Sequence, residues 1–167
     1  MSGRSQQSGS GNAGFTNRLW RYGPLILWMV GIFLASTDSL SGTKTAAVIG
    51  PLLRWFFPQI SEHRVELVHL LVRKAAHFSE YAVLGLLGAR AFISSSRAAL
   101  THYWFLAALL LLSLYAFSDE FHQSFVATRT SSVYDSLIDI SGGLTALVAL
   151  ALWRRARSGK NLAASNR

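Results

Sequence analysis

The chain contains four long apolar segments, and these constrain its fold more than any other feature. They span residues 19–36, 75–93, 103–118 and 133–153. A helix that crosses the hydrocarbon core of a bilayer needs about 17–25 mostly apolar residues. The third segment carries no charge, whereas the helices of soluble proteins carry charges on one face. The sequence therefore predicts an all-α integral membrane bundle of four transmembrane helices rather than a soluble helical bundle.

Composition excludes several other classes of protein. A length of 167 residues allows one domain at most. The chain has no cysteine, which removes disulfide frameworks, thiolate nucleophiles and cysteine-ligated metals. The net charge is +8, but only 14% of residues are charged, and the basic ones are spread thinly among apolar runs. We therefore expect no nucleic-acid surface, which would need dense Lys and Arg on a polar face.

The ends of the chain differ from its centre. Residues 1–17 are mostly Gly, Ser, Gln and Asn, which predicts a disordered cytoplasmic tail. Residues 18–156 form the predicted membrane domain, and residues 157–167 a basic cytoplasmic tail. The first apolar segment also fits a signal peptide, but three further segments favour an anchor helix that stays uncleaved.

A long connection, residues 37–66, joins the first two segments. Its stretch Leu-Leu-Arg-Trp-Phe-Phe, residues 52–57, mixes aromatic side chains with Arg54. This mixture is typical of a loop or short helix that lies in the membrane interface. The connection either covers a polar site as a lid or simply rests on the membrane, and the sequence leaves both open.

Basic residues indicate the orientation in the membrane. Four spans place both termini on one side, and that side also receives the connection between the second and third segments. These regions hold most of the Lys and Arg residues, including the Arg-Arg-Ala-Arg run at residues 154–157. Because cytoplasmic loops carry an excess of Lys and Arg, we expect both termini in the cytoplasm.

With this orientation, polar residues from three segments meet at the outer end of the bundle. Ionisable residues inside a membrane are costly and are usually functional. The converging residues are Lys74, His77, Glu80, Asp119, Glu120, Gln123, Arg129, Asp135 and Asp139.

The second segment carries one stripe of residues at helical spacing. These residues lie 3, 4, 4 and 3 positions apart and share a helix face: Lys74, His77, Tyr81, Gly85 and Gly88. The glycines, with Gly142 and Gly143 on the fourth segment, predict close helix packing. Packing accounts for the glycines, and Lys74 can reach the interface, but packing does not account for His77.

The fourth segment carries Asp135 and Asp139 four residues apart on one face. Two unpaired carboxylates there would repel each other, so either one takes up a proton or a cation compensates. Lys74, His77 and Arg129 are the available compensating groups, and a structural ion pair of Lys74 or Arg129 with Asp135 or Asp139 is as good an interpretation as a functional one. Arg129 could also bind a carboxylate or phosphate bidentately. Ser131 or Ser132 could cap the start of this helix.

Neither a metal site nor a cofactor site is predicted from spacing. His77 and Glu80 form an i, i+3 pair, and Glu120, His122 and Asp139 could add ligands, but no recognised metal motif is present. A Gly-x-Ser-x-Gly nucleophile motif is also lacking. Acid–base catalysis stays open, with these candidate catalytic residues: His77, Glu120, Asp135 and Asp139.

Two patterns resemble a known family. The pattern Lys74-x-x-His77-x-x-x-Tyr81-x-x-Leu84-Gly85 resembles the first motif of VanZ-like membrane proteins. A second pattern resembles the second motif of the same family. It consists of Asp119-Glu120-x-x-Gln123 followed by Arg129-x-x-Ser132-x-x-Asp135-x-x-x-Asp139-x-x-Gly142. This chain has Asp139 where the family often has Asn, which adds a negative charge. The resemblance implies a small multi-pass protein of the bacterial inner membrane. The family's founding member is associated with resistance to the glycopeptide teicoplanin.

Two functions are expected from these observations. The first is an outward-facing polar pocket that binds a cell-envelope component, such as a lipid-linked precursor, or a lipophilic glycopeptide. Its expected ligand-binding residues are Lys74, His77, Tyr81, Glu120, Gln123, Arg129, Asp135 and Asp139. The alternative is an intramembrane acid–base hydrolase or transferase that acts on a lipid-linked substrate. A transporter or channel is less favoured, because four helices leave little room for a pathway. Membrane lipids are the expected partners, and the oligomeric state stays open.

Overall fold

The computed structural model describes residues 8–36, 42–125 and 132–165, without the side chains of residues 8–13, 42–46 and 161–165. Over these ranges the chain is α-helical and contains no strand, as the sequence predicts. The helices are, in order, α1 (Ser8–Ala35), α2 (Gly42–Phe56), α3 (Glu62–Ile93), α4 (Ala98–His102), α5 (Trp104–Gln123) and α6 (Val133–Ser165).

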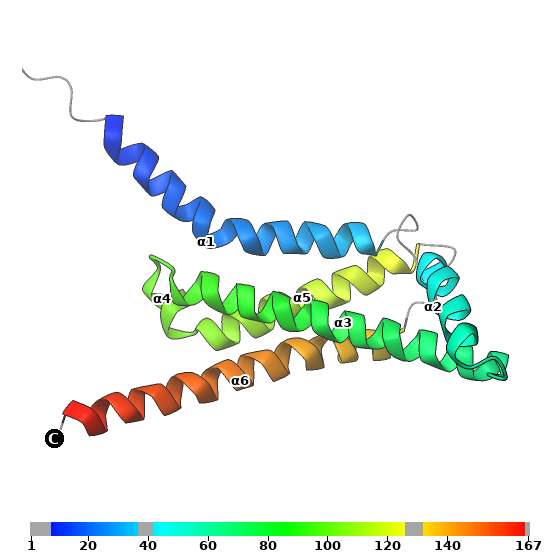
Figure 1. Cartoon of the computed structure of the whole chain (residues 1–167). Helices are drawn as coiled ribbons and strands as arrows, with labels where there is room; N and C mark the ends of the chain where they lie inside the picture. The colour runs from blue at the N-terminus through cyan, green and yellow to red at the C-terminus, as the bar shows by residue number, and fades with distance from the viewer. Residues whose placement is uncertain (1–7, 37–41, 126–131, 166–167) are drawn as a thin grey trace, which may run out of the picture.

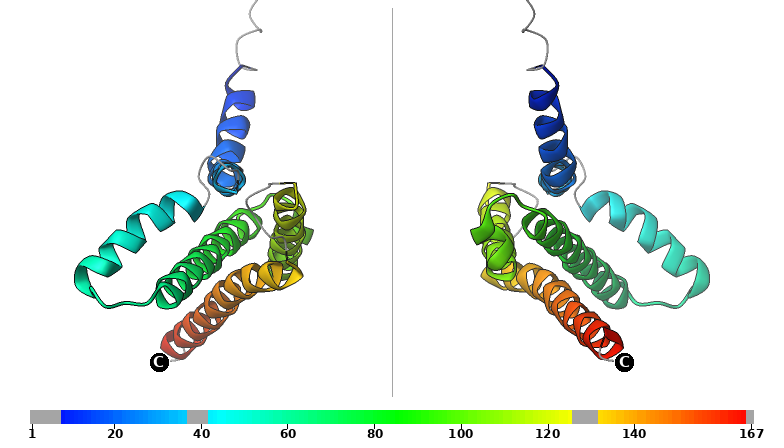
Figure 2. Two further views of the ribbon diagram at one scale, coloured as in Figure 1. Left: turned by 90° about the vertical axis from the view of Figure 1, so that its right-hand side faces the viewer. Right: turned by 90° about the vertical axis from the view of Figure 1, so that its left-hand side faces the viewer.

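Four long helices lie lengthwise beside one another (Figure 1). Helix α3 is central, because it packs against α1, α5 and α6. The start of α1 and the end of α6 lie at one end of the bundle, together with the short α4. Helix α2 lies at the other end and packs against α3, on the side away from α5 (Figure 2).

The closest packing joins α3 to α6 through glycines. A Cβ atom built on Gly142 would lie 2.2 Å from the carbonyl oxygen of Phe78, a distance that Cβ atoms in proteins essentially never show. A Cβ atom on Gly143 would lie 2.8 Å from Leu112 of α5. On α3, a Cβ atom on Gly85 would lie 3.0 Å from the carbonyl oxygen of Gly143. These contacts confirm the prediction that the glycines allow backbones to approach.

Helix α1 bends along its length (Figure 1), and Pro24 lies inside it. Proline has no backbone N–H, so the carbonyl of Trp20 has no i+4 donor within the helix. The guanidinium of Arg90 donates to that carbonyl at 3.1 Å, from the end of α3. A tertiary contact therefore satisfies the backbone acceptor that the proline leaves without its helical donor.

Two further hydrogen bonds attach α1 to the bundle. The indole N–H of Trp28 donates to the backbone carbonyl of Glu80 at 2.9 Å. The hydroxyl of Tyr115 donates to the carbonyl of Met29 at 2.5 Å. Both donors are aromatic side chains that combine a large apolar surface with one polar group, which suits them to join apolar helices.

Two of the described helices are long and apolar enough to cross a membrane: Trp104–Gln123, and Val133–Lys160 within α6. Helices α1 and α3 do not meet that criterion, because their apolar segments include groups such as Arg21, Glu80 and Arg90. The prediction of four transmembrane helices is thus supported by length and composition for the third and fourth segments only.

The helices extend beyond the apolar segments that predicted them. Helix α1 begins at Ser8, within the tail that composition predicted to be disordered, and α6 continues to Ser165. Helix α3 begins at Glu62, well before the second apolar segment. Hydropathy marks only the apolar part of a helix, whereas backbone hydrogen bonding continues through polar residues. The 37–66 connection contains the helix α2, whose basic end is joined to α3 by the exposed ion pair of Arg54 with Glu62, at 2.7 Å.

Candidate functional site

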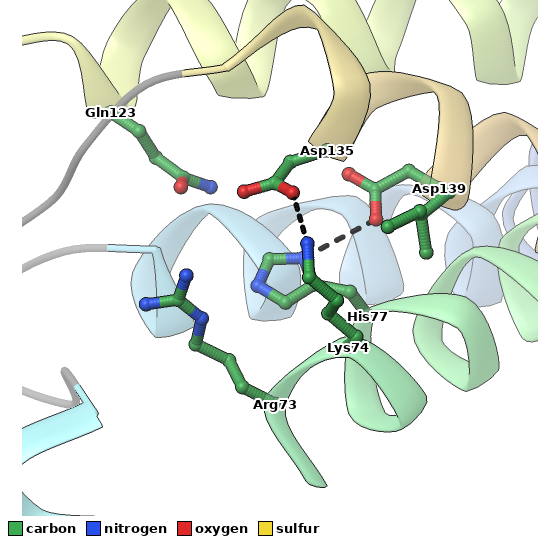
Figure 3. A pocket seen from close by; sticks show the side chains of 7 residues that line it. Arg73, Lys74, His77, Gln123, Asp135 and Asp139 are labelled. Atoms are coloured by element: carbon green, nitrogen blue, oxygen red, sulfur yellow. Dashed lines mark hydrogen bonds and ion pairs between the residues drawn. The ribbon is translucent and has the colours of Figure 1, made fainter. Parts of the chain in front are cut away.

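Polar side chains from three helices meet at the end of the bundle where α2 lies. They surround a pocket with an empty volume of about 350 Å³, counting its mouth. Figure 3 shows this pocket between the first half of α3 and the first turns of α6. Its lining consists of Arg73, Lys74, His77, Gln123, Asp135, Ile138 and Asp139. The structure thus brings together five of the residues that the sequence singled out.

Lys74 and Asp135 form an ion pair across the mouth of the pocket. The ammonium nitrogen lies 2.5 Å from a carboxylate oxygen, with the side chains 33% and 28% exposed. The pair joins α3 to α6, and it neutralises both charges. The structural interpretation of Asp135 as the partner of a cation is therefore confirmed, with Lys74 as that cation.

His77 faces Asp139 on the inner side of the pocket (Figure 3). Nδ1 of the imidazole lies 3.4 Å from Oδ1 of the carboxylate. Asp139 is only 2% exposed, and this oxygen has no hydrogen-bond partner. Buried carboxylate oxygens are normally hydrogen-bonded, so the contact leaves Asp139 only partly satisfied.

Asp119 lies on α5 behind the pocket and is 3% exposed. Its Oδ2 accepts a hydrogen bond of 2.9 Å from the amide nitrogen of Gln123, one turn further along. The same nitrogen reaches the hydroxyl of Ser36, at the end of α1, at 3.4 Å. Oδ1 of Asp119 is buried and has no hydrogen-bond partner. The sequence placed Asp119 among the converging residues but did not indicate a ligand-binding or catalytic role for it.

Glu120 does not line the pocket, although the sequence proposed it as a ligand-binding or catalytic residue. Its carboxylate is buried and accepts a hydrogen bond from the backbone N–H of Ser132. The hydroxyl of Ser132 in turn accepts one from the backbone N–H of Tyr134 at 3.3 Å. Ser132, one of the two residues predicted to cap this helix, therefore caps α6. Glu120 holds Ser132 against the end of α5.

Arg73 lines the pocket but was not among the predicted site residues. No described residue forms a hydrogen bond or an ion pair with its guanidinium. Figure 3 shows this group reaching toward the side of the pocket where Gln123 lies. In the sequence, the only feature that distinguished Arg73 was its position next to Lys74. That position indicated a residue at the membrane boundary rather than one that binds a ligand.

Three other proposed residues lie elsewhere. Tyr81 is fully buried one turn beyond His77, and its hydroxyl has no hydrogen-bond partner. The ring of His122 packs against Phe33 of α1, with centroids 4.5 Å apart. Arg129, with its proposed role as an anion ligand, lies outside the described residues.

One cluster has the composition of a metal site. His77, Asp119 and Asp139 each offer a donor atom, and these atoms all lie within 4.8 Å of one another. The residues come from α3, α5 and α6, so no spacing along the chain could reveal the cluster.

Comparison with known proteins identifies the family. A family model described as VanZ/LLP1 matches residues 22–154, which is most of the chain and includes the whole site. No curated protein and no solved structure matches the chain significantly. Membership of this family and the two apolar helices indicate a membrane protein. The chain belongs to the VanZ/LLP1 family, as its two polar motifs predicted.

Proposed function

We propose that the pocket binds the anionic headgroup of a cell-envelope component, either a lipid-linked precursor or a lipophilic glycopeptide. The observation that carries this proposal is the guanidinium of Arg73, which lines the pocket without a counter-ion among the described residues. A guanidinium binds phosphate or carboxylate through two parallel hydrogen bonds. Such a ligand would supply the negative charge that pairs with Arg73, which no residue in the described part of the protein supplies.

The rest of the pocket supports binding of a small polar group. The pocket is open at its mouth and lined mostly by polar side chains, which suits contact with the polar group of a headgroup rather than with a whole lipid. Because Lys74 is neutralised by Asp135, it would orient a ligand through a remaining N–H rather than attract it. Gln123 and His77 add further hydrogen-bonding groups.

The outer surface of the bundle supports a lipid-linked ligand. All four long helices expose large apolar side chains, which in water would form an unusually large apolar surface. These side chains include Leu27, Leu71, Leu86, Leu106, Leu110, Leu114, Leu137 and Leu152. A lipid tail can lie against this surface while its headgroup enters the pocket.

We also propose four membrane spans in the bacterial inner membrane, with both termini in the cytoplasm, and the apolar surface of the four long helices supports the spans themselves. The start of α1 and the described end of α6 lie at the same end of the bundle, opposite the pocket (Figure 1). Helix α2 lies at the same end of the bundle as the pocket and ends in exposed aromatic side chains, Trp55 and Phe56, which Phe57 follows. Exposed aromatic groups favour the membrane–water interface, so the pocket would open at the outer interface.

Binding can be measured on the full chain in nanodiscs of neutral phosphatidylcholine. The probes are undecaprenyl phosphate for the lipid-linked class and teicoplanin for the glycopeptide class. We expect Arg73→Gln to weaken binding of the preferred probe by about 10–100-fold, the value of a charge-assisted bidentate contact. Arg64→Gln is the matched control, because Arg64 is exposed on the same helix outside the pocket.

The two probes separate the two ligand classes. Binding of one probe alone would assign the pocket to that class. If neither probe binds, or if Arg73→Gln and Arg64→Gln weaken binding equally, the pocket does not recognise such headgroups through Arg73.

A further inference from the structure

We propose that His77, Asp119 and Asp139 bind one divalent transition-metal ion on the inner side of the pocket. The three residues belong to α3, α5 and α6, and their donor atoms lie within 4.8 Å of one another. Donors that bind one ion at about 2.0–2.2 Å with tetrahedral geometry lie roughly 3.4 Å apart. Small rotations of the three side chains would close that difference.

Unsatisfied oxygens point to a ligand at this place. Asp119 and Asp139 are 3% and 2% exposed, and Oδ1 of each is buried without a hydrogen-bond partner. The hydroxyls of Tyr81 and Ser136 are also fully buried without a partner, one turn along the helices from His77 and Asp139. Buried polar groups without partners cost free energy, and a metal ion with bound water would satisfy them.

The local charges favour a doubly charged cation. Lys74 neutralises Asp135, and the backbone of Ser132 donates to Glu120. Within the described part of the chain, His77 then forms the only ion pair with Asp119 or Asp139, because Arg73 lines the same pocket but pairs with neither. A protonated imidazole would cancel one of the two charges, whereas a divalent cation cancels both and leaves the imidazole neutral, as a ligand must be.

The donor types indicate the class of metal. One imidazole and two carboxylates suit Zn²⁺, Mn²⁺ or Fe²⁺, and no thiolate is available to select a softer ion. Three protein ligands leave at least one coordination position open. Because His77 and Asp139 also line the pocket, that position would face the pocket and take a water molecule or a ligand oxygen.

The site can be tested with metal alone on the full chain in detergent, purified without a polyhistidine tag. The protein is first stripped of metal with EDTA and then dialysed against excess Zn²⁺ or Mn²⁺. Inductively coupled plasma mass spectrometry should then find about one ion per chain. The thermal unfolding midpoint should rise by several degrees with metal, because an ion that binds only the folded state stabilises it. Asp119→Asn should lose both the bound ion and the rise.

The neighbouring substitution Glu120→Gln is the matched control. Glu120 is also buried on α5 but lies outside the cluster, and an amide oxygen can still accept from Ser132. Glu120→Gln should therefore keep the ion and the shift. His77→Gln provides a second variant, should Asp119→Asn fail to fold.

Two results would overturn the metal site. One is wild-type protein that takes up no ion and shows no shift. The other is metal uptake that survives both Asp119→Asn and His77→Gln. The measurement contains no lipid or glycopeptide, so its outcome is independent of whether the pocket binds an anionic headgroup.

Discussion

At the scale of single residues, the pocket shows how two packed helices of an apolar bundle accommodate charge. Lys74 and Asp135 are each about a third exposed, and each lies within hydrogen-bonding distance of the other. Partial exposure limits the desolvation that an ion pair must overcome, but it also weakens the Coulomb attraction. The pair is therefore expected to join two helices with modest strength rather than to dominate stability.

A double-mutant cycle measures that strength. Lys74→Met keeps the apolar stem of the side chain, and Asp135→Asn keeps the shape of the carboxyl group. We expect a coupling free energy of about 1 kcal/mol in the free energy of unfolding, measured by denaturation in mixed micelles. Strictly additive effects of the two substitutions would show that the contact does not contribute to stability.

At the scale of helices, α3 and α6 are held together by backbone proximity. Neighbouring helices can approach this closely only where one of them lacks a Cβ atom, as at Gly142 and Gly143. The approach also positions the site, because His77 and Asp139 lie within one turn of the contact between Phe78 and Gly142. Packing and site geometry therefore depend on the same pair of helices.

Gly142→Ala should be strongly destabilising. The added Cβ would meet the Phe78 carbonyl at 2.2 Å, and a backbone carbonyl cannot move without shifting α3. We expect a loss of about 1–3 kcal/mol or more in the free energy of unfolding, with a lower thermal midpoint.

Gly88→Ala is the control on α3. Its Cβ would lie 3.6 Å from the Cβ of Ala108, an ordinary contact, and alanine favours helix over glycine by about 1 kcal/mol. This variant should be neutral or more stable. Equal losses for Gly142→Ala and Gly88→Ala would mean that the close contact at Gly142 is not what holds the helices together.

At the scale of the whole molecule, the two ends of the bundle differ in chemistry. The pocket lies at one end, and the start of α1 and the described end of α6 lie at the other (Figure 1). At that second end, the guanidinium of Arg154 lies 5.8 Å from the Trp104 ring centroid, and that of Arg157 lies 4.2 Å from the Trp153 ring centroid. Paired basic and aromatic groups are typical of a membrane interface on the cytoplasmic side.

Cysteine labelling tests this orientation, because the chain has no cysteine of its own. Three exposed positions suit single substitutions: Ser124 at the pocket end, and Thr101 and Ser158 at the opposite end. In intact cells, a membrane-impermeant maleimide should label Ser124→Cys and leave the other two unlabelled. In permeabilised cells, all three should react. Labelling of Ser158→Cys in intact cells, with Ser124→Cys protected, would reverse the orientation.

Features that depend on local order along the chain could be predicted from the sequence. Hydropathy located the four long helices, since apolar content is a local property. Helical spacing placed Lys74 and His77 on one face of α3, and Asp135 and Asp139 on one face of α6. The motifs that contain these residues also indicated the family.

Only the tertiary structure decided which of these faces meet and how deeply each residue lies. It brought Asp119 of α5 to His77 and Asp139, and it placed Arg73 in the pocket. It also showed that Glu120, which the sequence predicted to bind a ligand, instead accepts a hydrogen bond from Ser132 at the cap of α6. The physical reason is that helical periodicity fixes the relative angle of residues on one helix, whereas the rotation and depth of each helix come from packing against its neighbours.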